Sequence, residues 1–156
     1  MTFYSRKSAR IPNYDYSSRN YYFVTICSNK RRCIFGDPDH LNFLGKTVEE
    51  NIVRLSSHYE AVRIDKYVVM PNHVHMIVVL ESQRDNLNQI IAQYKSGVTR
   101  VLRKSGYEMD VWQRSYHDHV IRNQQAYEKI WLYIDSNPMN WKKDCFYMDP
   151  NMGKTQ

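Results

Sequence analysis

The sequence predicts an α+β fold: a ferredoxin-like β-α-β-β-α-β sandwich with a further helix appended at its C-terminal end. Runs rich in β-branched and aromatic residues alternate with segments whose apolar residues recur at helical spacing. Along the chain their order is strand, helix, strand, strand, helix, strand, helix. With 156 residues, 42% of them hydrophobic and 24% charged, the chain has the length and composition of one globular domain.

The first half of this domain contains three predicted strands and one helix. Residues 21–27 (YYFVTIC) and 59–70 form two strands, and a turn at Pro71-Asn72 leads into a third over 73–80 (HVHMIVVL). Both alternating faces of this third strand are largely apolar after its histidines, which indicates a central strand covered on both sides. Between the first two strands, Asp37-Pro38 is expected to start a helix, as an N-cap followed by proline.

The second half contains a helix, a strand and the appended helix. Apolar residues at helical spacing predict a helix over 87–102, and residues 111–122 form the fourth strand. The last helix is expected from Gln124 to about Asn137, where Pro138 stops it.

The basic residues are clustered, although the net charge is only +6. Residues 1–32 hold seven lysines and arginines against Asp15 alone. Residues 86–107 hold four and no acid: Lys95, Arg100, Arg103 and Lys104. Such clusters favour a polyanionic partner such as a nucleic acid, because each neutralised phosphate releases counterions. A solvated basic face without a partner is the alternative.

Cysteines and hydropathy bear on the cellular compartment. Cys27, Cys33 and Cys145 lack the C-x2-4-C spacing of a zinc site and are interpreted as reduced thiols. No apolar segment follows the basic N-terminus, and no apolar run approaches the ~18 residues that span a membrane. The sequence therefore predicts a cytoplasmic protein.

Two histidines at the start of the central strand form a candidate metal site. Alternate strand residues project from the same face, so His73 and His75 can offer two nitrogens to one divalent ion. A purely structural histidine pair is the alternative.

A second candidate lies at the end of the last predicted helix. Tyr133 and Asn137, four residues apart, lie one turn from each other on one flank of its buried stripe. A nucleophile and a metal ligand on this flank would meet a two-histidine site together. Alternatively, Tyr133 packs at the edge of the core while Asn137 caps the helix.

Three segments in order, YVVMPNHVHMIVVL, WQRSYHDHVIRN and YIDSNP, resemble the IS200-like single-tyrosine (HUH) transposases. The resemblance is closest to their REP-associated tyrosine transposase branch and extends from about Arg10 to Trp141. It implies a catalytic domain over residues 20–141, preceded by a basic and aromatic arm (1–19) and followed by a short C-terminal tail (142–156).

The resemblance also implies roles for matched residues. His73, His75 and Asn137 would bind Mg²⁺ or Mn²⁺, with asparagine at the third position as in the REP-associated branch. Tyr133 would be the nucleophile that cleaves single-stranded or hairpin DNA and forms a 5′-phosphotyrosine intermediate. His119 lies in a segment that recurs in the family. It could support the site from the core or take part in it by direct contact, and the resemblance does not distinguish the two. The choice between homodimer and monomer is also open.

The basic clusters supply candidate DNA contacts. Lys95, next to the buried stripe of its helix, is the first choice for a phosphate contact, and Arg100 lies on the same helix. In the arm, Arg10, Tyr14 and Tyr16 could read a short guide sequence by stacking and base contacts. A disordered arm is the alternative.

Other classes of function remain compatible with the pattern. A non-catalytic nucleic-acid-binding module of RNA-recognition-like fold would share the element order, although the first and third strands lack the aromatic RNA-binding motif. A metal hydrolase would use the two histidines with an activated water and form no covalent link. A third alternative is a related protein that no longer transposes.

Overall fold

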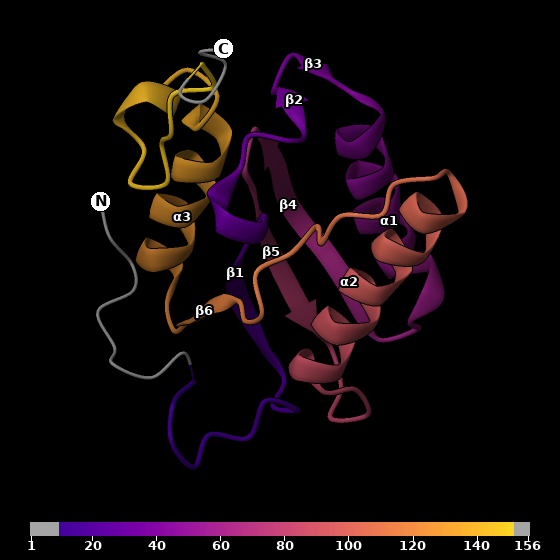
Figure 1. The fold of residues 1–156 in the computed structure, drawn as a ribbon. Coiled ribbons are helices and arrows are strands. Elements are labelled where there is room, and N and C mark those ends of the chain that lie inside the picture. The colour runs from indigo at the N-terminus through magenta and orange to yellow at the C-terminus, as the bar shows by residue number, and fades with distance from the viewer. Residues whose placement is uncertain (1–9, 152–156) are drawn as a thin grey trace.

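The computed structural model describes residues 10–151, and the predicted α+β class is confirmed (Figure 1). Its centre is a four-stranded antiparallel sheet in the order β4-β5-β1-β6. These strands are β1 (Asn20–Cys27), β4 (Val62–Met70), β5 (His73–Leu80) and β6 (His117–Ile121). Residues 1–9 of the predicted arm and residues 152–156 of the predicted tail lie outside the described residues.

Helices cover both faces of the sheet. Helices α1 (Phe43–His58) and α2 (Leu87–Lys104) lie on one face, and α3 (Gln124–Ser136) lies on the other (Figure 1). Short elements complete the order: a hairpin of β2 (Gly36–Asp37) and β3 (His40–Leu41), and two 3₁₀ turns, η1 (Asn29–Arg31) and η2 (Trp141–Lys143). Within residues 10–151, no helix has both the length and the apolarity to cross a membrane.

Strand β5 is the central strand that its composition predicts. All eight of its residues are buried, and it pairs with β1 on one side and β4 on the other. Its side chains alternate between two hydrophobic clusters, because successive residues of a strand point to opposite faces. Val74 and Met76 belong to the cluster under α1 and α2, whereas Ile77 and Val79 belong to the cluster under α3.

The predicted start of the first helix is wrong. Helix α1 begins after the N-cap Asn42, whose side chain accepts a hydrogen bond from the Gly45 amide at 3.0 Å. Asp37-Pro38 lies instead at the turn of the β2-β3 hairpin. Aspartate and proline favour turns as well as helix starts, so this dipeptide does not distinguish the two. Gly36 enters the hairpin at φ 85°, a left-handed conformation that glycine adopts without strain.

Two predicted strands are longer than the observed ones. Residues 111–116 precede β6 as a loop, in which the backbone of Trp112 forms an isolated bridge with Ser28. Tyr59, the expected start of the second strand, is the C-cap of α1 and donates its amide to Leu55.

Helix α3 is attached to the sheet by a small apolar cluster. Ile130 and Ile134 are fully buried against Phe23 and Ile77. This cluster determines where the C-terminal end of α3 lies relative to β5.

Replacing Ile130 with alanine should therefore lower the free energy of unfolding by about 2–5 kcal/mol, through lost apolar burial and the cavity that remains. Leu132→Ala, on the same helix but with 62% of the residue exposed, is the matched control and should change it by less than about 0.5 kcal/mol. Urea unfolding monitored by circular dichroism measures both. Equal effects of the two variants would contradict the assigned packing of α3.

Candidate active site

The site starts at the tight turn between β4 and β5. His73 is the first residue of β5, and both His73 and His75 project toward α3 with no exposed surface. Their Nε2 atoms lie 3.0 Å apart. The two imidazoles therefore lie on one face of the strand, as predicted, and their Nε2 atoms face each other.

Asn72 orients the first imidazole. Its amide nitrogen donates to two carbonyl oxygens, those of Arg31 at 3.1 Å and Phe146 at 2.8 Å. Its Oδ1 consequently faces His73 and accepts from Nδ1 at 2.8 Å. Because neutral imidazole carries one proton, a proton on Nδ1 leaves the Nε2 lone pair of His73 directed into the site.

Thr25 orients the second imidazole. The β1–β5 register places Thr25 opposite His75, and Thr25 Oγ1 lies 2.7 Å from His75 Nδ1. A hydroxyl can donate or accept, so it can hold His75 with the proton on either nitrogen. When Oγ1 accepts from Nδ1, the Nε2 lone pair of His75 is available to a cation.

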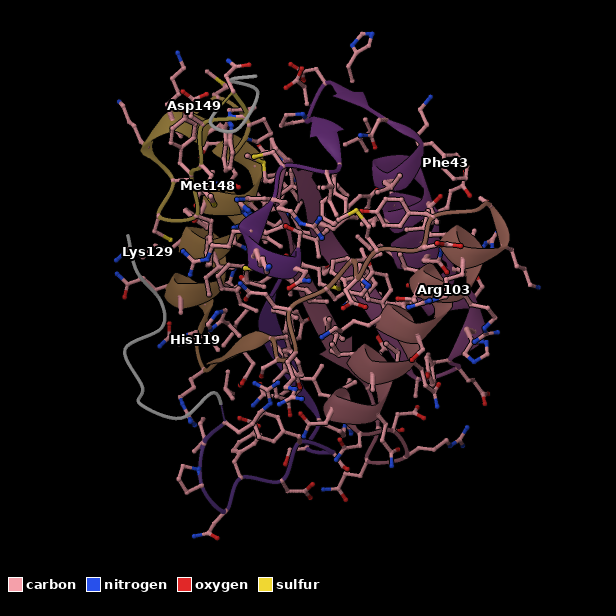
Figure 2. All side chains as sticks on the ribbon, in the orientation of Figure 1. Phe43, Arg103, His119, Lys129, Met148 and Asp149 are labelled. Atoms are coloured by element: carbon pink, nitrogen blue, oxygen red, sulfur yellow. The ribbon has the colours of Figure 1, made fainter. Side chains whose placement is uncertain are left out.

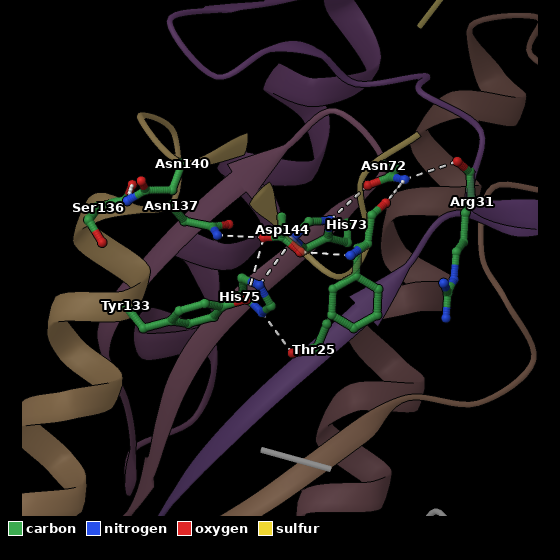
Figure 3. Close-up of polar contacts among 11 residues, drawn as sticks. Thr25, Arg31, Asn72, His73, His75, Tyr133, Ser136, Asn137, Asn140 and Asp144 are labelled. Carbon is green, nitrogen blue, oxygen red and sulfur yellow. Dashed lines mark hydrogen bonds and ion pairs between the residues drawn. The ribbon is translucent and has the colours of Figure 1, made fainter. Parts of the chain in front are cut away.

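Helix α3 brings the two predicted residues to the histidine pair. The ring centroid of Tyr133 lies 5.3 Å from that of His75 and 6.1 Å from that of Phe23. Asn137, the C-cap of α3, is only 2% exposed. Tyr133, Asn137 and the two histidines, which come from α3 and β5, therefore share one site (Figure 3).

Asp144 also occupies this site, although the sequence analysis did not single it out. Its Oδ2 accepts from Asn137 Nδ2 at 2.5 Å and from the Tyr133 hydroxyl at 3.4 Å, and lies 3.8 Å from His73 Nε2 (Figure 3). Its other oxygen, Oδ1, accepts from the Phe146 amide at 2.8 Å. A carboxylate therefore lies at the centre of the polar contacts.

The segment around Asp144 packs on the histidines. Phe146 is buried, with its ring centroid 4.9 Å from that of His73, and the Trp141 centroid lies 5.9 Å from the same imidazole. Figure 2 shows the next residues, Met148 and Asp149, beside the C-terminal part of α3. One feature of the sequence could have predicted that this segment packs on the domain, since large aromatic side chains are usually buried. The segment contains three of them: Trp141, Phe146 and Tyr147.

Burial controls the protonation of the site. Desolvation lowers the pKa of His73 to about 4, although the Asp144 charge opposes this shift. Desolvation, and then the neighbouring His73, hold the pKa of His75 well below its usual value. Burial, followed by the Asp144 charge, raises the pKa of Tyr133 well above that of free tyrosine. Both imidazoles are therefore neutral near pH 7, and the phenol keeps its proton.

Two histidines of β6 flank the site. His117 pairs with Thr25 and His119 pairs with Phe23, so both lie on the sheet face that carries α3. The His117 ring centroid is 6.1 Å from that of Phe146, so this histidine, which the sequence analysis did not consider, lies on the side of the site. His119 is half-buried and lies on β6 (Figure 2).

The described part of the arm is attached to β6. Arg10 pairs with Asp118 at 3.0 Å, and its guanidinium lies 3.3 Å from the centroid of the Tyr116 ring. The Tyr16 hydroxyl donates to the other Asp118 oxygen at 3.0 Å. Tyr14 shares a 3.0 Å hydroxyl contact with Tyr22. Arg10 and Tyr14 thus have partners within the protein, and their contact with DNA stays a prediction.

The basic residues of α2 line an open groove. The groove is lined by these four basic residues and by four further residues: Ser96, Thr99, Trp112 and Gln113. The basic residues are Lys95, Arg100, Arg103 and Lys104. Lys95 Nζ donates to the Gln113 carbonyl at 2.6 Å, and burial lowers its pKa. Arg103 projects from α2 with its side chain 55% exposed (Figure 2). The groove and the histidine pair lie on different sides of the sheet, because α2 and α3 cover opposite faces.

Comparison with known sequences identifies the family. The profile of the family described as Transposase IS200 like matches residues 16–137. A Haemophilus influenzae protein of uncharacterized function is 34% identical over 169 aligned residues, covering 92% of this chain and 94% of the relative. Another H. influenzae protein, described as a candidate REP-associated tyrosine transposase, is 26% identical, covering 86% of this chain and 84% of the relative. The chain belongs to the IS200-like transposase family, and the predicted likeness to its REP-associated branch is confirmed.

Two solved structures share the fold. The structure of the REP-associated tyrosine transposase bound to a REP hairpin has a TM-score of 0.66 and 22% identity, covering 90% of this chain and 74% of that one. A crystal structure of a candidate transposase from Deinococcus radiodurans R1 has a TM-score of 0.55 and 13% identity, covering 81% of this chain and 95% of that one.

The buried imidazoles predict a loss of stability in acid. In the unfolded chain a histidine has a pKa of about 6.5, so the unfolded state binds the proton first as the pH falls. The resulting loss begins near the unfolded pKa and continues down to the folded value of about 4 for His73. Between about pH 7.5 and pH 5, His73 alone should remove roughly 2 kcal/mol of stability.

His73→Gln should reduce this pH dependence by roughly that amount, since glutamine does not titrate. Urea unfolding in EDTA at both pH values, compared with wild type, measures the difference. The same dependence in both proteins would contradict the assignment of a buried neutral His73.

Proposed function

We propose that this transposase cleaves and rejoins single-stranded or hairpin DNA by transesterification, with Tyr133 as the nucleophile and a divalent cation at the histidine pair. The observation that carries the proposal is the convergence of the Tyr133 phenol, the two Nε2 atoms and the Asn137 amide at one buried place. A structural histidine pair would not need a tyrosine hydroxyl and a side-chain amide directed at the same point.

The residues present suit Mg²⁺ or Mn²⁺. Asn72 and Thr25 contact the Nδ1 atoms of the two imidazoles, which leaves both Nε2 atoms for a cation. Asn137 Oδ1 is buried and makes no hydrogen bond of normal geometry within residues 10–151. Two neutral nitrogens and an amide oxygen form a mixed set that favours an exchangeable ion over structural zinc. Such an ion would supply Lewis-acid stabilisation of charge on the scissile phosphate.

Tyr133 would perform the covalent step. Its oxygen forms a bond to phosphorus while the bond from phosphorus to the 3′-oxygen breaks, which gives a 5′-phosphotyrosine and a free 3′-hydroxyl. The phenolic proton is lost and the departing 3′-oxygen gains one. Because the ester bond is conserved, a 3′-hydroxyl can attack the phosphotyrosine in the reverse direction without ATP.

The DNA substrate class is supported by burial and by one relative. In the described structure both histidines are fully buried, so a flexible strand fits the site better than a rigid duplex. The solved relative of the same fold was bound to a REP hairpin. The basic groove of α2 would hold phosphates of such a DNA, because Arg100 and Arg103 are exposed there beside the Trp112 ring.

Tyr133→Phe should abolish formation of a covalent protein–DNA adduct. Wild type with Mn²⁺ or Mg²⁺ and labelled hairpin DNA should give a denaturant-resistant species, and EDTA should prevent it. Tyr127→Phe, on the same helix, is the matched control and should form the adduct. Gel electrophoresis under denaturing conditions measures this outcome. An adduct that persists in Tyr133→Phe would exclude Tyr133 as the nucleophile.

The same experiment separates the alternatives. A non-catalytic module of RNA-recognition-like fold would bind the hairpin without cleaving it. A hydrolase that uses an activated water would give cleaved DNA, and no adduct would appear at any time.

Arg100→Ala should weaken hairpin binding several-fold and reduce the slope of log affinity against log salt by about 1, since one phosphate contact is lost. Fluorescence anisotropy with the Tyr133→Phe background in EDTA measures binding without cleavage. Lys46→Ala, an exposed position of α1 outside the groove, serves as the control. An unchanged salt slope in Arg100→Ala would remove the groove from the DNA interface.

A further inference from the structure

We propose that Asp144 is a further protein ligand of the divalent cation, which makes the site a set of two imidazoles, one amide and one carboxylate. The inference rests on the proposed function only in placing a cation at His73 and His75. Asp144 lies beyond the family match, which ends at residue 137, so the match assigns it no role.

Distances place the carboxylate within ligand range. One ligand atom from each of His73, His75 and Asp144 lies within 4.8 Å of the others. The closest pair is formed by the two Nε2 atoms at 3.0 Å, and Asp144 Oδ2 is 3.8 Å from His73 Nε2. One cation with bonds of about 2.1 Å can therefore contact all three atoms after small adjustments of the side chains.

The buried carboxylate of Asp144 favours a cation at this site. The Asp144 side chain has no exposed surface, and His73 is the sole basic partner within 4.0 Å among residues 10–151. Burying a carboxylate away from water without a positively charged partner is unfavourable. A divalent cation between Asp144 and the histidines supplies the missing charge.

Asn137 provides a second, independent observation. Its Nδ2 donates to Asp144 Oδ2 at 2.5 Å, while its Oδ1 is buried without a hydrogen bond of normal geometry in the described structure. A buried acceptor without a partner is uncommon in proteins, and it indicates that a donor or a cation binds there. The amide oxygen and the carboxylate are thus adjacent, and both lack a positive partner.

The chain holds Asp144 in this position from both sides. Oδ1 accepts from the Phe146 amide at 2.8 Å, which leaves Oδ2 directed at the site. The Phe146 carbonyl is in turn bound by Asn72, the residue that orients His73. The carboxylate and the first imidazole are therefore positioned by one connected set of hydrogen bonds.

A calorimetric titration of the full chain with Mn²⁺, without DNA, tests the inference. Asp144→Asn keeps the shape of the side chain and removes its charge, and should weaken Mn²⁺ binding at least 10-fold. Asp149→Asn, an exposed carboxylate of the same segment, is the matched control and should bind as wild type does. Wild-type affinity in Asp144→Asn would overturn the inference.

Two further measurements keep the outcomes distinct. His73→Gln should also lose Mn²⁺ affinity; if it does not, the histidine pair is not the cation site and the proposed function fails with it. If His73→Gln loses affinity and Asp144→Asn does not, only the role of Asp144 fails. Thermal unfolding in EDTA should show Asp144→Asn to be at least as stable as wild type. A less stable variant would indicate a structural carboxylate and would also overturn the inference.

Discussion

The pairing register between β1 and β5 is the constraint on which the site depends. It places Thr25 opposite His75, and at the turn that leads into β5 Asn72, the residue before His73, is held by the carbonyls of Arg31 and Phe146. Each imidazole therefore has its Nδ1 held by a neighbour that is itself held in place. Because a hydrogen bond at Nδ1 determines which ring nitrogen is left facing the other way, these contacts direct both Nε2 atoms into the site.

The two faces of the sheet differ in composition. The face under α1 and α2 carries the larger apolar cluster, whereas the face under α3 combines a small apolar cluster with the histidines. Ile130 and Ile134 position α3, and Tyr133 and Asn137 extend from the same helix over the polar end of β5. The larger apolar core on one face of the sheet therefore offsets the cost of burying polar side chains on the other face.

The sequence predicted most of the regular elements and the side chains that meet in the candidate site. His73, His75, Tyr133 and Asn137 lie on strongly periodic segments, so spacing alone placed each pair on one face. Asp37-Pro38 was misassigned because aspartate and proline are compatible with both a helix start and a hairpin turn. Asp144 follows the last regular helix, and its place in the site depends on contacts of Phe146 and Trp141 that no local periodicity encodes. The partners of Arg10 are also long-range, since Asp118 is 108 residues away.

The alternation of side chains along β5 has a consequence for how this protein can change in evolution. If the turn stays in place, one residue inserted or deleted between it and His73 would rotate both histidines to the face under α1 and α2, where Val74 and Met76 now pack. The same change would expose aliphatic groups to the phenol of α3. Among related chains, changes in length should therefore occur in the loops, whereas the length of β5 and the alternation of its side chains should be kept.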